Sequence, residues 1–531
     1  MPTLLGYVVG GSLQEGLTIR LETHINPETI KTGKFVSIVG NTYRFFCIIT
    51  DLQLHVTNPD IVTYPPTISE TLLHSILRTR DLYATACVKP MVMVDQHNRV
   101  VPVKTIPWHF SSVYEATEQD VSLIFGSEKD ASGNYFMIGT PLDMTTAVCI
   151  NLERITQRSN GIFGKTGTGK TFITRVLLAG LMKHQKAVNL IFDMHSEYGL
   201  QARQEKSSHA FVKGLKTLFP HQTAIFSLDP TSTRRRGGSA DVSVIIGYDA
   251  IQVDDILSLQ DELNLHSTAV EAAYLIAAKY KQQWLSTLLT QGDGLKKLAD
   301  EVGAHPESIT ALYRKLKRIE RLPFFVHQHP DNMIDQLMEY INRGISIIIE
   351  FGNYTSTFSY LLVANIITRR IHQEYVARTE QFLGSGKADD EPRQLLITIE
   401  EAHKFLNPNA ARQTIFGTIA REMRKYYVSL LIVDQRPSEI DPEICSQIGT
   451  KIVAQLNDEK DIHAVLTGTA NSSILRTVLA SLDSKKQALV FGHAITMPIV
   501  IETRTYDELF YKQMGFTYTT TNAKGLIQEI F

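Results

Sequence analysis

Short apolar runs, separated by turn-forming residues, recur through the first 110 positions of the chain. Glycine and proline stand between the runs, as at Gly10-Gly11 and Pro65-Pro66. Short strands at regular intervals with turn signals between them predict a small β-barrel. We assign strands to 4–9, 17–21, 35–39, 43–49, 83–94 and 99–106. No catalytic pattern accompanies them, so we expect residues 1–110 to form an assembly or docking domain.

Beyond position 110 the apolar runs become continuous and alternate with stretches of helical periodicity. Continuous runs of branched apolar residues are typical of strands buried on both faces of a parallel sheet. Apolar residues at helical spacing predict a helix over 171–184. We expect strands at 135–139, 147–152, 161–163, 187–192, 223–228, 346–351, 395–399, 428–433, 450–456, 486–493 and 497–503. Strands that alternate with helices predict an α/β core.

Residues 250–342 interrupt this alternation with helical patterns, which predict a helical bundle inserted into the core. Thr268 and Glu271 have the spacing of a capping box that opens a helix over 269–289. A second helix begins at His305-Pro306 and carries Arg314, Lys315, Lys317, Arg318 and Arg321, which with Glu320 are most simply a solvated face. The core then comprises residues 111–249 and 343–505, and residues 506–531 form an arm that we expect to dock on a neighbouring copy.

Composition adds limits on partners and location. Among the 531 residues, 53 are basic and 55 acidic, so the formal net charge is −2 and any contact with nucleic acid must come from a local patch. The four cysteines, Cys47, Cys87, Cys149 and Cys445, have no metal-ligand spacing and indicate reduced thiols. No apolar run approaches the ~18 residues of a membrane span. We therefore expect a cytoplasmic protein with no membrane segment.

A glycine-rich motif lies between the expected strand 161–163 and the expected helix 171–184. It fits the phosphate-binding pattern of a glycine, four residues, glycine, lysine and threonine. Backbone N–H groups of such a loop surround a nucleotide's phosphates, the lysine adds a positive charge, and the threonine hydroxyl can ligate Mg²⁺. The candidate nucleotide-binding residues are Gly164, Lys165, Thr166, Gly167, Thr168, Gly169, Lys170 and Thr171.

Acidic residues follow two of the expected buried strands. Glu400 and Glu401 end the strand 395–399, and a P-loop ATPase needs one acid for the Mg²⁺ shell and one to polarise the attacking water. We assign Glu400 to the metal and Glu401 to the water. Asp193 and Glu197 follow the strand 187–192. They could orient water or the Mg²⁺ shell, or they could be turn and cap residues.

One glutamine and several arginines have the positions of auxiliary residues. Gln435 follows the strand 428–433, where it could sense the γ-phosphate. Arg424 lies on an expected helix over 411–425, and Arg158 lies just before the strand that enters the phosphate loop. Arginines of this kind can stabilise transition-state charge across a subunit boundary. The run Arg234–Arg236, followed by two glycines, is either a flexible loop that contacts phosphates or a solvated surface loop.

The order of these motifs resembles the HerA family, within the FtsK–HerA group of ring ATPases. The matching features are the barrel, the loop 164–171, Asp193 with Glu197 and Tyr198, the helical insertion, Glu400-Glu401-Ala402-His403, Arg421–Tyr426 and Gln435-Arg436-Pro437-Ser438. The resemblance implies a RecA-like P-loop ATPase core with an N-terminal small β-barrel and an inserted helical bundle. It also implies ATP and Mg²⁺ as cofactors, a homohexameric ring, and double-stranded DNA moved through its pore.

The resemblance assigns nucleotide and Mg²⁺ binding to Lys170 and Thr171, water activation to Glu401 and γ-phosphate sensing to Gln435. It makes Arg424 the candidate arginine donated by the next subunit and Arg158 a second one. Two functions remain open: a DNA translocase that works with a NurA-like nuclease, and an ATPase platform whose barrel docks an antiviral effector such as a nuclease or a sirtuin-like NAD-consuming enzyme. A conjugation or packaging motor is disfavoured because no membrane segment is present.

Overall fold

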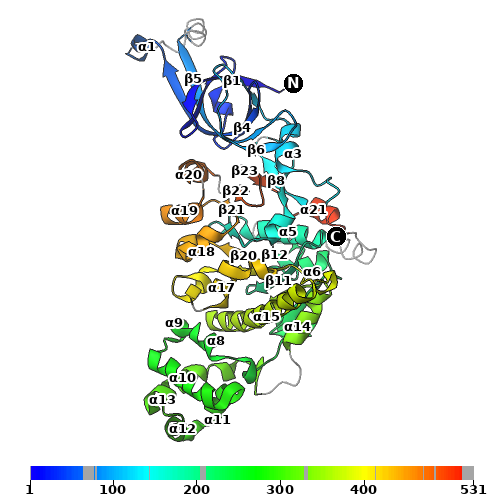
Figure 1. Cartoon of the computed structure of the whole chain (residues 1–531), viewed down its shortest axis with the longest axis vertical. Coiled ribbons are helices and arrows are strands. Elements are labelled where there is room, and N and C mark those ends of the chain that lie inside the picture. Colours follow the sequence, from blue (N-terminus) through cyan, green and yellow to red (C-terminus); the bar gives the residue numbers. More distant parts are fainter. Residues whose placement is uncertain are drawn as a thin grey trace, which may run out of the picture. The chain divides into compact units, whose positions relative to one another are not determined.

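The chain forms two compact units in a computed structural model, which describes residues 2–63, 77, 81–142, 144–203, 211–327, 333–412, 414–469, 472–482 and 486–516 (Figure 1). The first unit comprises residues 1–155, 162–173 and 449–504, and the second comprises 156–161, 174–448 and 505–531. The chain passes between them within β10 (Asn160–Phe163) and within α5 (Lys170–Lys183).

The N-terminal part of the first unit is a closed antiparallel barrel. Its strands follow the order β2-β1-β7-β3-β4-β5, and a pairing of β2 with β5 closes the ring. The bounds are β1 (Leu4–Ser12), β2 (Gly16–Leu21), β3 (Phe35–Val39), β4 (Arg44–Val56), β5 (Leu82–Val94), β6 (Val100–Pro102) and β7 (Ser112–Glu115). The predicted barrel is thus confirmed. Strand β7 has no sequence prediction, because a four-residue strand of mixed polarity has no distinctive periodicity.

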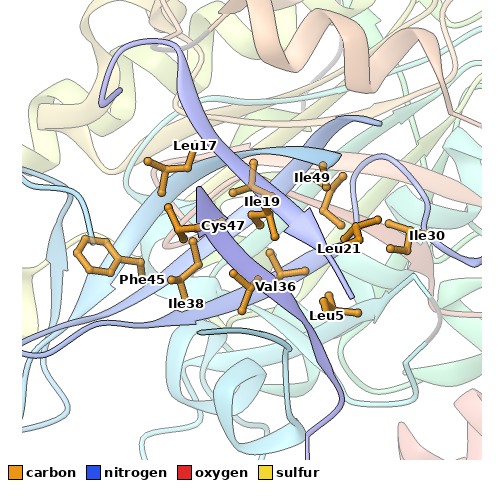
Figure 2. Packing of buried hydrophobic residues seen from close by; sticks show 14 of the residues in the cluster. Leu5, Leu17, Ile19, Leu21, Ile30, Val36, Ile38, Phe45, Cys47 and Ile49 are labelled. Carbon is orange, nitrogen blue, oxygen red and sulfur yellow. The ribbon is translucent and has the colours of Figure 1, made fainter. Parts of the chain in front are cut away.

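Alternation of apolar and polar residues along these strands places one apolar face inside the ring. Figure 2 shows Leu17, Ile19, Val36 and Ile38 meeting in this core. Cys47 lies among them, and burial raises the pKa of its thiol well above the ordinary range. The four cysteines are all free thiols, as expected.

The first unit also contains an antiparallel run of strands in the order β21-β22-β23-β8-β9. Its elements are β8 (Tyr135–Pro141), β9 (Val148–Asn151), α4 (Leu152–Thr156), β21 (Thr450–Ala454), α19 (Glu459–Leu466), α20 (Ser472–Ala480), β22 (Gln487–Gly492) and β23 (Ile499–Thr503), with α3 (Glu118–Phe125) preceding them. The barrel packs against this layer, since the Thr32 hydroxyl lies 3.2 Å from Ser481 Oγ.

The second unit is built on a parallel sheet with the strand order β15-β14-β18-β11-β19-β20. Asp193 of β11 is in register with Glu350 of β18, and Glu400 at the end of β19 pairs with Val433, one residue before the end of β20. The carboxyl ends of these strands therefore bring several acids to one edge. The bounds are β11 (Val188–Asp193), β14 (Thr223–Ser227), β15 (Val242–Ser243), β18 (Ser346–Glu350), β19 (Leu395–Glu400) and β20 (Val428–Asp434).

Helices flank this sheet. They are α6 (Leu215–Leu218), α7 (Pro230–Arg235), α14 (Met333–Asn342), α15 (Thr357–Ser385), α16 (His403–Leu406), α17 (Ile415–Glu422), α18 (Pro442–Gln447) and α21 (Glu508–Gln513). The expected helix 411–425 is α-helical only in α17, with 3-10 turns on either side. Of the expected arm, residues 517–531 lie outside the described part, and Tyr506 packs on its own unit by donating a hydrogen bond to the Lys213 carbonyl.

The expected helical insertion is present between β15 and β18, where α10 to α13 gather in Figure 1. Its helices are α8 (Val253–Leu257), α9 (Gln260–Leu263), α10 (Ser267–Tyr280), α11 (Trp284–Thr290), α12 (Leu295–Val302) and α13 (Pro306–Leu316). The single helix expected over 269–289 is wrong, because Lys281 takes a φ of 51° and separates α10 from α11. The expected capping box is also wrong: His266 is the N-cap, and its ring accepts the Thr268 N–H.

Buried polar contacts attach the insertion to the core. Arg369 of α15 forms an ion pair of 2.7 Å with Asp255 of α8, which is fully buried. The indole of Trp284 in α11 donates to the Ile251 carbonyl over 2.8 Å. Among the described residues, no helix is both long enough and apolar enough to cross a membrane.

Candidate nucleotide site

The phosphate loop belongs to the first unit and has the predicted arrangement of strand, loop and helix. It runs from the end of β10 at Phe163 to the start of α5 at Lys170. Gly164 needs to be glycine, because its φ is 157° and a Cβ atom there would lie 2.9 Å from the Ala454 Cβ. Gly167 and Gly169 also have positive φ angles. The glycines of the motif thus serve the turn, as their pattern predicts.

Contacts within the loop fix its shape. The Lys170 ammonium donates to the Gly164 and Lys165 carbonyls over 2.7 and 3.0 Å, so the side chain lies back over the loop. The Thr168 hydroxyl donates to the Lys165 carbonyl, and the Lys165 N–H donates to the Gln455 carbonyl of the segment after β21. The charge of Lys170 therefore lies beside the backbone that the motif uses for phosphates. Nucleotide binding by these residues stays a prediction.

Glu400 ends β19 in the second unit and is held by two buried tyrosines. Its Oε1 accepts a hydrogen bond of 2.8 Å from the Tyr198 hydroxyl, and its backbone N–H and carbonyl contact the Tyr360 hydroxyl. Burial, together with the charge of Asp193, raises the pKa of Glu400 to about 8. Its Oε2 is buried without a hydrogen-bond partner. An acceptor of this kind fits the shell of a hydrated Mg²⁺ ion, which makes the assignment of Glu400 to the metal compatible with the geometry.

Glu401 turns away from the strand. Its φ is 51°, an uncommon conformation for a residue with a side chain, and such backbone strain clusters at functional sites. Gln435 Nε2 donates to Glu401 Oε1 over 3.0 Å. The Lys404 ammonium lies 3.6 Å from Oε2, and about a quarter of the Glu401 side chain is exposed. The structure therefore brings together the two residues that the sequence assigned to water activation and γ-phosphate sensing.

Sequence reasoning missed the hydrogen-bonded pair of His403 and Asp434, in which His403 lies beside the Glu401 carboxylate. Asp434 ends β20, is fully buried at its carboxylate, and accepts hydrogen bonds from the His403 backbone N–H and from His403 Nδ1 at 2.7 and 2.9 Å. His403 Nε2 lies 3.7 Å from Glu401 Oε2. Burial alone would lower the pKa of His403, but the hydrogen bond and charge of Asp434 raise it. The sequence signal that could have identified Asp434 as a site residue is its position directly after the expected strand 428–433.

Asp193 has the role of a turn residue. It is fully buried, and its carboxylate accepts the N–H groups of Glu197, Tyr198 and Gly199. Burial raises its pKa to about 6, and these hydrogen bonds oppose the shift. The loop that Asp193 shapes delivers the Tyr198 hydroxyl to Glu400. The sequence left open whether Asp193 orients water or the Mg²⁺ shell, or is a turn and cap residue, and these contacts favour the turn and cap role. Asp193 then affects Glu400 indirectly, by holding the loop that carries Tyr198.

The arginines have different outcomes. Arg236 does not belong to a flexible loop, because α7 includes Arg234 and Arg235 and the Arg236 guanidinium forms an ion pair of 2.6 Å with the buried Glu350. Arg158 is half-buried, and its role stays a prediction. Arg424 lies in a 3-10 turn (Met423–Tyr426), and its side chain lies outside the described part, so its role also stays a prediction.

The loop 164–171 belongs to the first unit, whereas Glu400, Glu401 and Gln435 belong to the second. That Lys170 and Glu401 act on one nucleotide stays a prediction. Among the described residues, no group of three or more histidine, cysteine, aspartate or glutamate side chains could hold a metal ion.

Comparisons with known proteins point to one family. Residues 136–371 match the family model for the central domain of helicase HerA. The DNA double-strand break repair helicase HerA of Saccharolobus solfataricus is 23% identical over 524 residues, which cover 95% of this chain and 93% of the relative. The protein of the same description from Pyrococcus furiosus is 23% identical over 443 residues, 78% and 76% of the two chains. The solved structure of VirB4 from Thermoanaerobacter pseudethanolicus aligns over 70% of this chain and 97% of its own, with 14% identity and a TM-score of 0.46.

Proposed function

Since the chain belongs to the HerA family of P-loop ATPases, we propose that it hydrolyses ATP and uses the energy to translocate double-stranded DNA. The observation that carries this proposal is the contact between Glu401 and Gln435 at the carboxyl ends of neighbouring parallel strands. Ligands of open α/β sheets bind at such ends. The curated relatives are described as DNA double-strand break repair helicases, which supports DNA as the substrate of the motor.

In this function Lys170 and the loop backbone bind the phosphates of ATP, and Thr171 with Glu400 holds the Mg²⁺ shell. A Mg²⁺ ion held there would neutralise charge on the phosphates. Glu401 accepts a proton from the attacking water, and Gln435 orients Glu401 through the hydrogen bond to Oε1. Asp434 and His403 hold the other side of the Glu401 carboxylate.

We propose a homohexameric ring in the cytoplasm, with DNA in its pore and Arg424 and Arg158 as candidate residues for contacting the nucleotide of a neighbouring subunit. The barrel would dock a nuclease. Trp108 and Phe110 lie between β6 and β7 with 77% and 73% of their surface exposed. Exposed aromatic side chains of this size often mark protein interaction sites, so they support a docking role for the barrel.

The test is ATPase activity with and without duplex DNA, combined with the mass of the assembly in solution. We expect stimulation by DNA and a mass of six chains. Absence of both would overturn the proposal, and a Lys170→Ala variant provides the inactive control because it removes the charge at the loop.

The same exposed aromatics also favour a second function, an ATPase platform that docks and regulates an antiviral effector such as a nuclease or an NAD-consuming enzyme. The two functions differ in what ATP hydrolysis does. If Lys170→Ala still assembles and fully activates the effector that co-purifies with the native ring, the platform is supported over the motor.

A further inference from the structure

The charges of the helical insertion are segregated along its sequence. Residues 250–307 contain nine acids and four cations, whereas residues 314–321 contain five cations and the single acid Glu320. Helices that are merely solvated usually mix both signs of charge. The end of α13 and the 3-10 turn that follows it (Ile319–Arg321) therefore form a local basic surface on a chain whose formal net charge is −2.

The backbone places these cations on one side. Lys317 and Arg318 keep right-handed helical φ and ψ angles between α13 and the 3-10 turn, so helical spacing continues through the run. Ile309, Leu312, Leu316 and Ile319 are fully buried and recur every three or four residues. Arg314 and Arg321 lie three or four residues from the adjacent pair Lys317 and Arg318, and all four are exposed. We call these four residues the basic face.

Within the part of the chain that the structure describes, the basic face forms no ion pair. Among the ion pairs that join described residues, none includes a member of this face, although exposed cations elsewhere pair with acids, as Lys279 does with Glu301. Lys317 donates to the Tyr313 hydroxyl, and the Arg318 guanidinium lies 4.6 Å above the Phe358 ring. Neither contact is an ion pair, and the acid that acts on Lys317 through its charge is the neighbouring Glu320.

We propose that the basic face binds the phosphodiester backbone of a nucleic acid. Along a helix, Arg314, Lys317 and Arg321 are separated by about 4.5 and about 6 Å, which spans about three nucleotides of one strand at ~3.4 Å each. Among the described residues of α13 and the following turn, no large apolar side chain is exposed. Protein interfaces have an apolar centre, so this surface fits a phosphate backbone better than an acidic protein.

The experiment measures how the affinity of the full-length protein for duplex DNA depends on salt. The variant Arg314→Gln, Lys317→Gln, Arg321→Gln keeps Arg318, which packs on Phe358. Each phosphate contact contributes about 0.9 to the slope of log K against log salt concentration, so we expect the slope to fall by about 2 to 3. In a parallel titration with single-stranded DNA, where each contact contributes about 0.7, we expect the slope to fall by about 2 if the face binds the backbone of one strand.

The matched control is Lys281→Gln, Lys296→Gln, Lys297→Gln, which removes the same charge from three exposed lysines of the same insertion. We expect its slope to fall by less than about 1. Equal slopes for the two variants, or a basic-face variant equal to the unmodified protein, would overturn the inference. The choice of DNA as the ligand rests on the proposed function, but different results would overturn the two claims. The proposed function fails if the unmodified protein neither binds DNA nor is stimulated by it. Thermal unfolding of both variants confirms that they fold.

Discussion

Glu401 takes a left-handed backbone conformation immediately after a buried strand, and this turns it away from Glu400. The two adjacent glutamates therefore differ in environment, although they are identical in the sequence. Glu400 is buried between Tyr198 and Tyr360, whereas Glu401 is partly exposed and contacts Gln435, Lys404 and His403. Two carboxyl groups with different surroundings can perform different tasks, one at a metal and one at a water molecule.

The first residue-scale prediction concerns the proposed base. Glu401→Gln removes the charge that would accept the proton of water but keeps the size of the side chain. Since general base catalysis contributes about 10²- to 10⁴-fold, we expect kcat to fall by about 100-fold or more. Affinity for a nonhydrolysable ATP analogue, measured by titration calorimetry, should stay within about twofold. A variant with normal kcat would exclude Glu401 as the base.

The second prediction concerns His403, whose ring is fixed by Asp434 and approaches Glu401. His403→Gln and Asp434→Asn should each let the Glu401 carboxylate shift, and small displacements of catalytic groups reduce rates strongly. We expect kcat to fall by about tenfold with KM unchanged. If each single variant and the double variant lose the same factor, the two residues act as one unit. A loss of thermal stability without loss of kcat would indicate a purely structural role.

The third prediction concerns Glu400, whose pKa burial raises to about 8. The folded state then holds a proton that the unfolded state releases above its ordinary pKa of 4.5, so this residue makes stability fall as pH rises from about 4.5 to 8. Glu400→Gln mimics the neutral acid. In metal-free buffer without nucleotide, we expect it to raise the midpoint of thermal unfolding by about 2 °C or more at pH 8 and to leave it unchanged near pH 4.5. Equal shifts of the unfolding midpoint at both pH values would contradict an effect of the raised Glu400 pKa.

At the scale of elements, periodicity and strand-end chemistry were sufficient for most of the α/β core. The strand that ends at Glu400 and the loop before α5 were predictable because continuous apolar runs and glycine patterns are local signals. The break between α10 and α11 was not, since nothing in the sequence marks the positive φ of Lys281. The role of Arg236 also depends on a partner that lies 114 residues away in the chain.

That partner, Glu350, joins α7 to the end of β18. Glu350 is fully buried, and its carboxylate accepts from both Arg236 and the Thr233 hydroxyl. Removing one member of a buried ion pair strands the other charge, so Arg236→Met should cost about 3 kcal/mol of unfolding free energy. Adding Glu350→Gln should restore more than half of that loss, because no uncompensated charge remains. Chemical denaturation of the two single variants and the double variant checks this, and additive losses would contradict the pairing.

At the scale of the whole molecule, the candidate nucleotide site depends on the position of residues that come from separate parts of the chain. Each half is recognisable from a local motif in the sequence. The expectation that the two halves act on one nucleotide comes from the resemblance to the HerA family. Lys170 and Glu401 are expected to act on the nucleotide of their own subunit, whereas Arg424 is the candidate that crosses to a neighbour. Rings repeat one heterologous interface, so every site would combine groups from two copies.

This expectation predicts recovery of activity when two inactive variants are mixed. Lys170→Ala loses its own site but still carries Arg424, and Arg424→Ala keeps its own site but gives no arginine to its neighbour. If the variants are denatured together and refolded into mixed rings at equal amounts, about one interface in four combines an intact site with an intact arginine, so we expect about a quarter of the original ATPase activity. The control mixes Lys170→Ala with Glu401→Gln. It should stay inactive, because both residues act within one subunit and no subunit of this mixture has both of them intact. Recovery in the control as large as in the test mixture would show that the acids, and not Arg424, are the groups that cross between subunits.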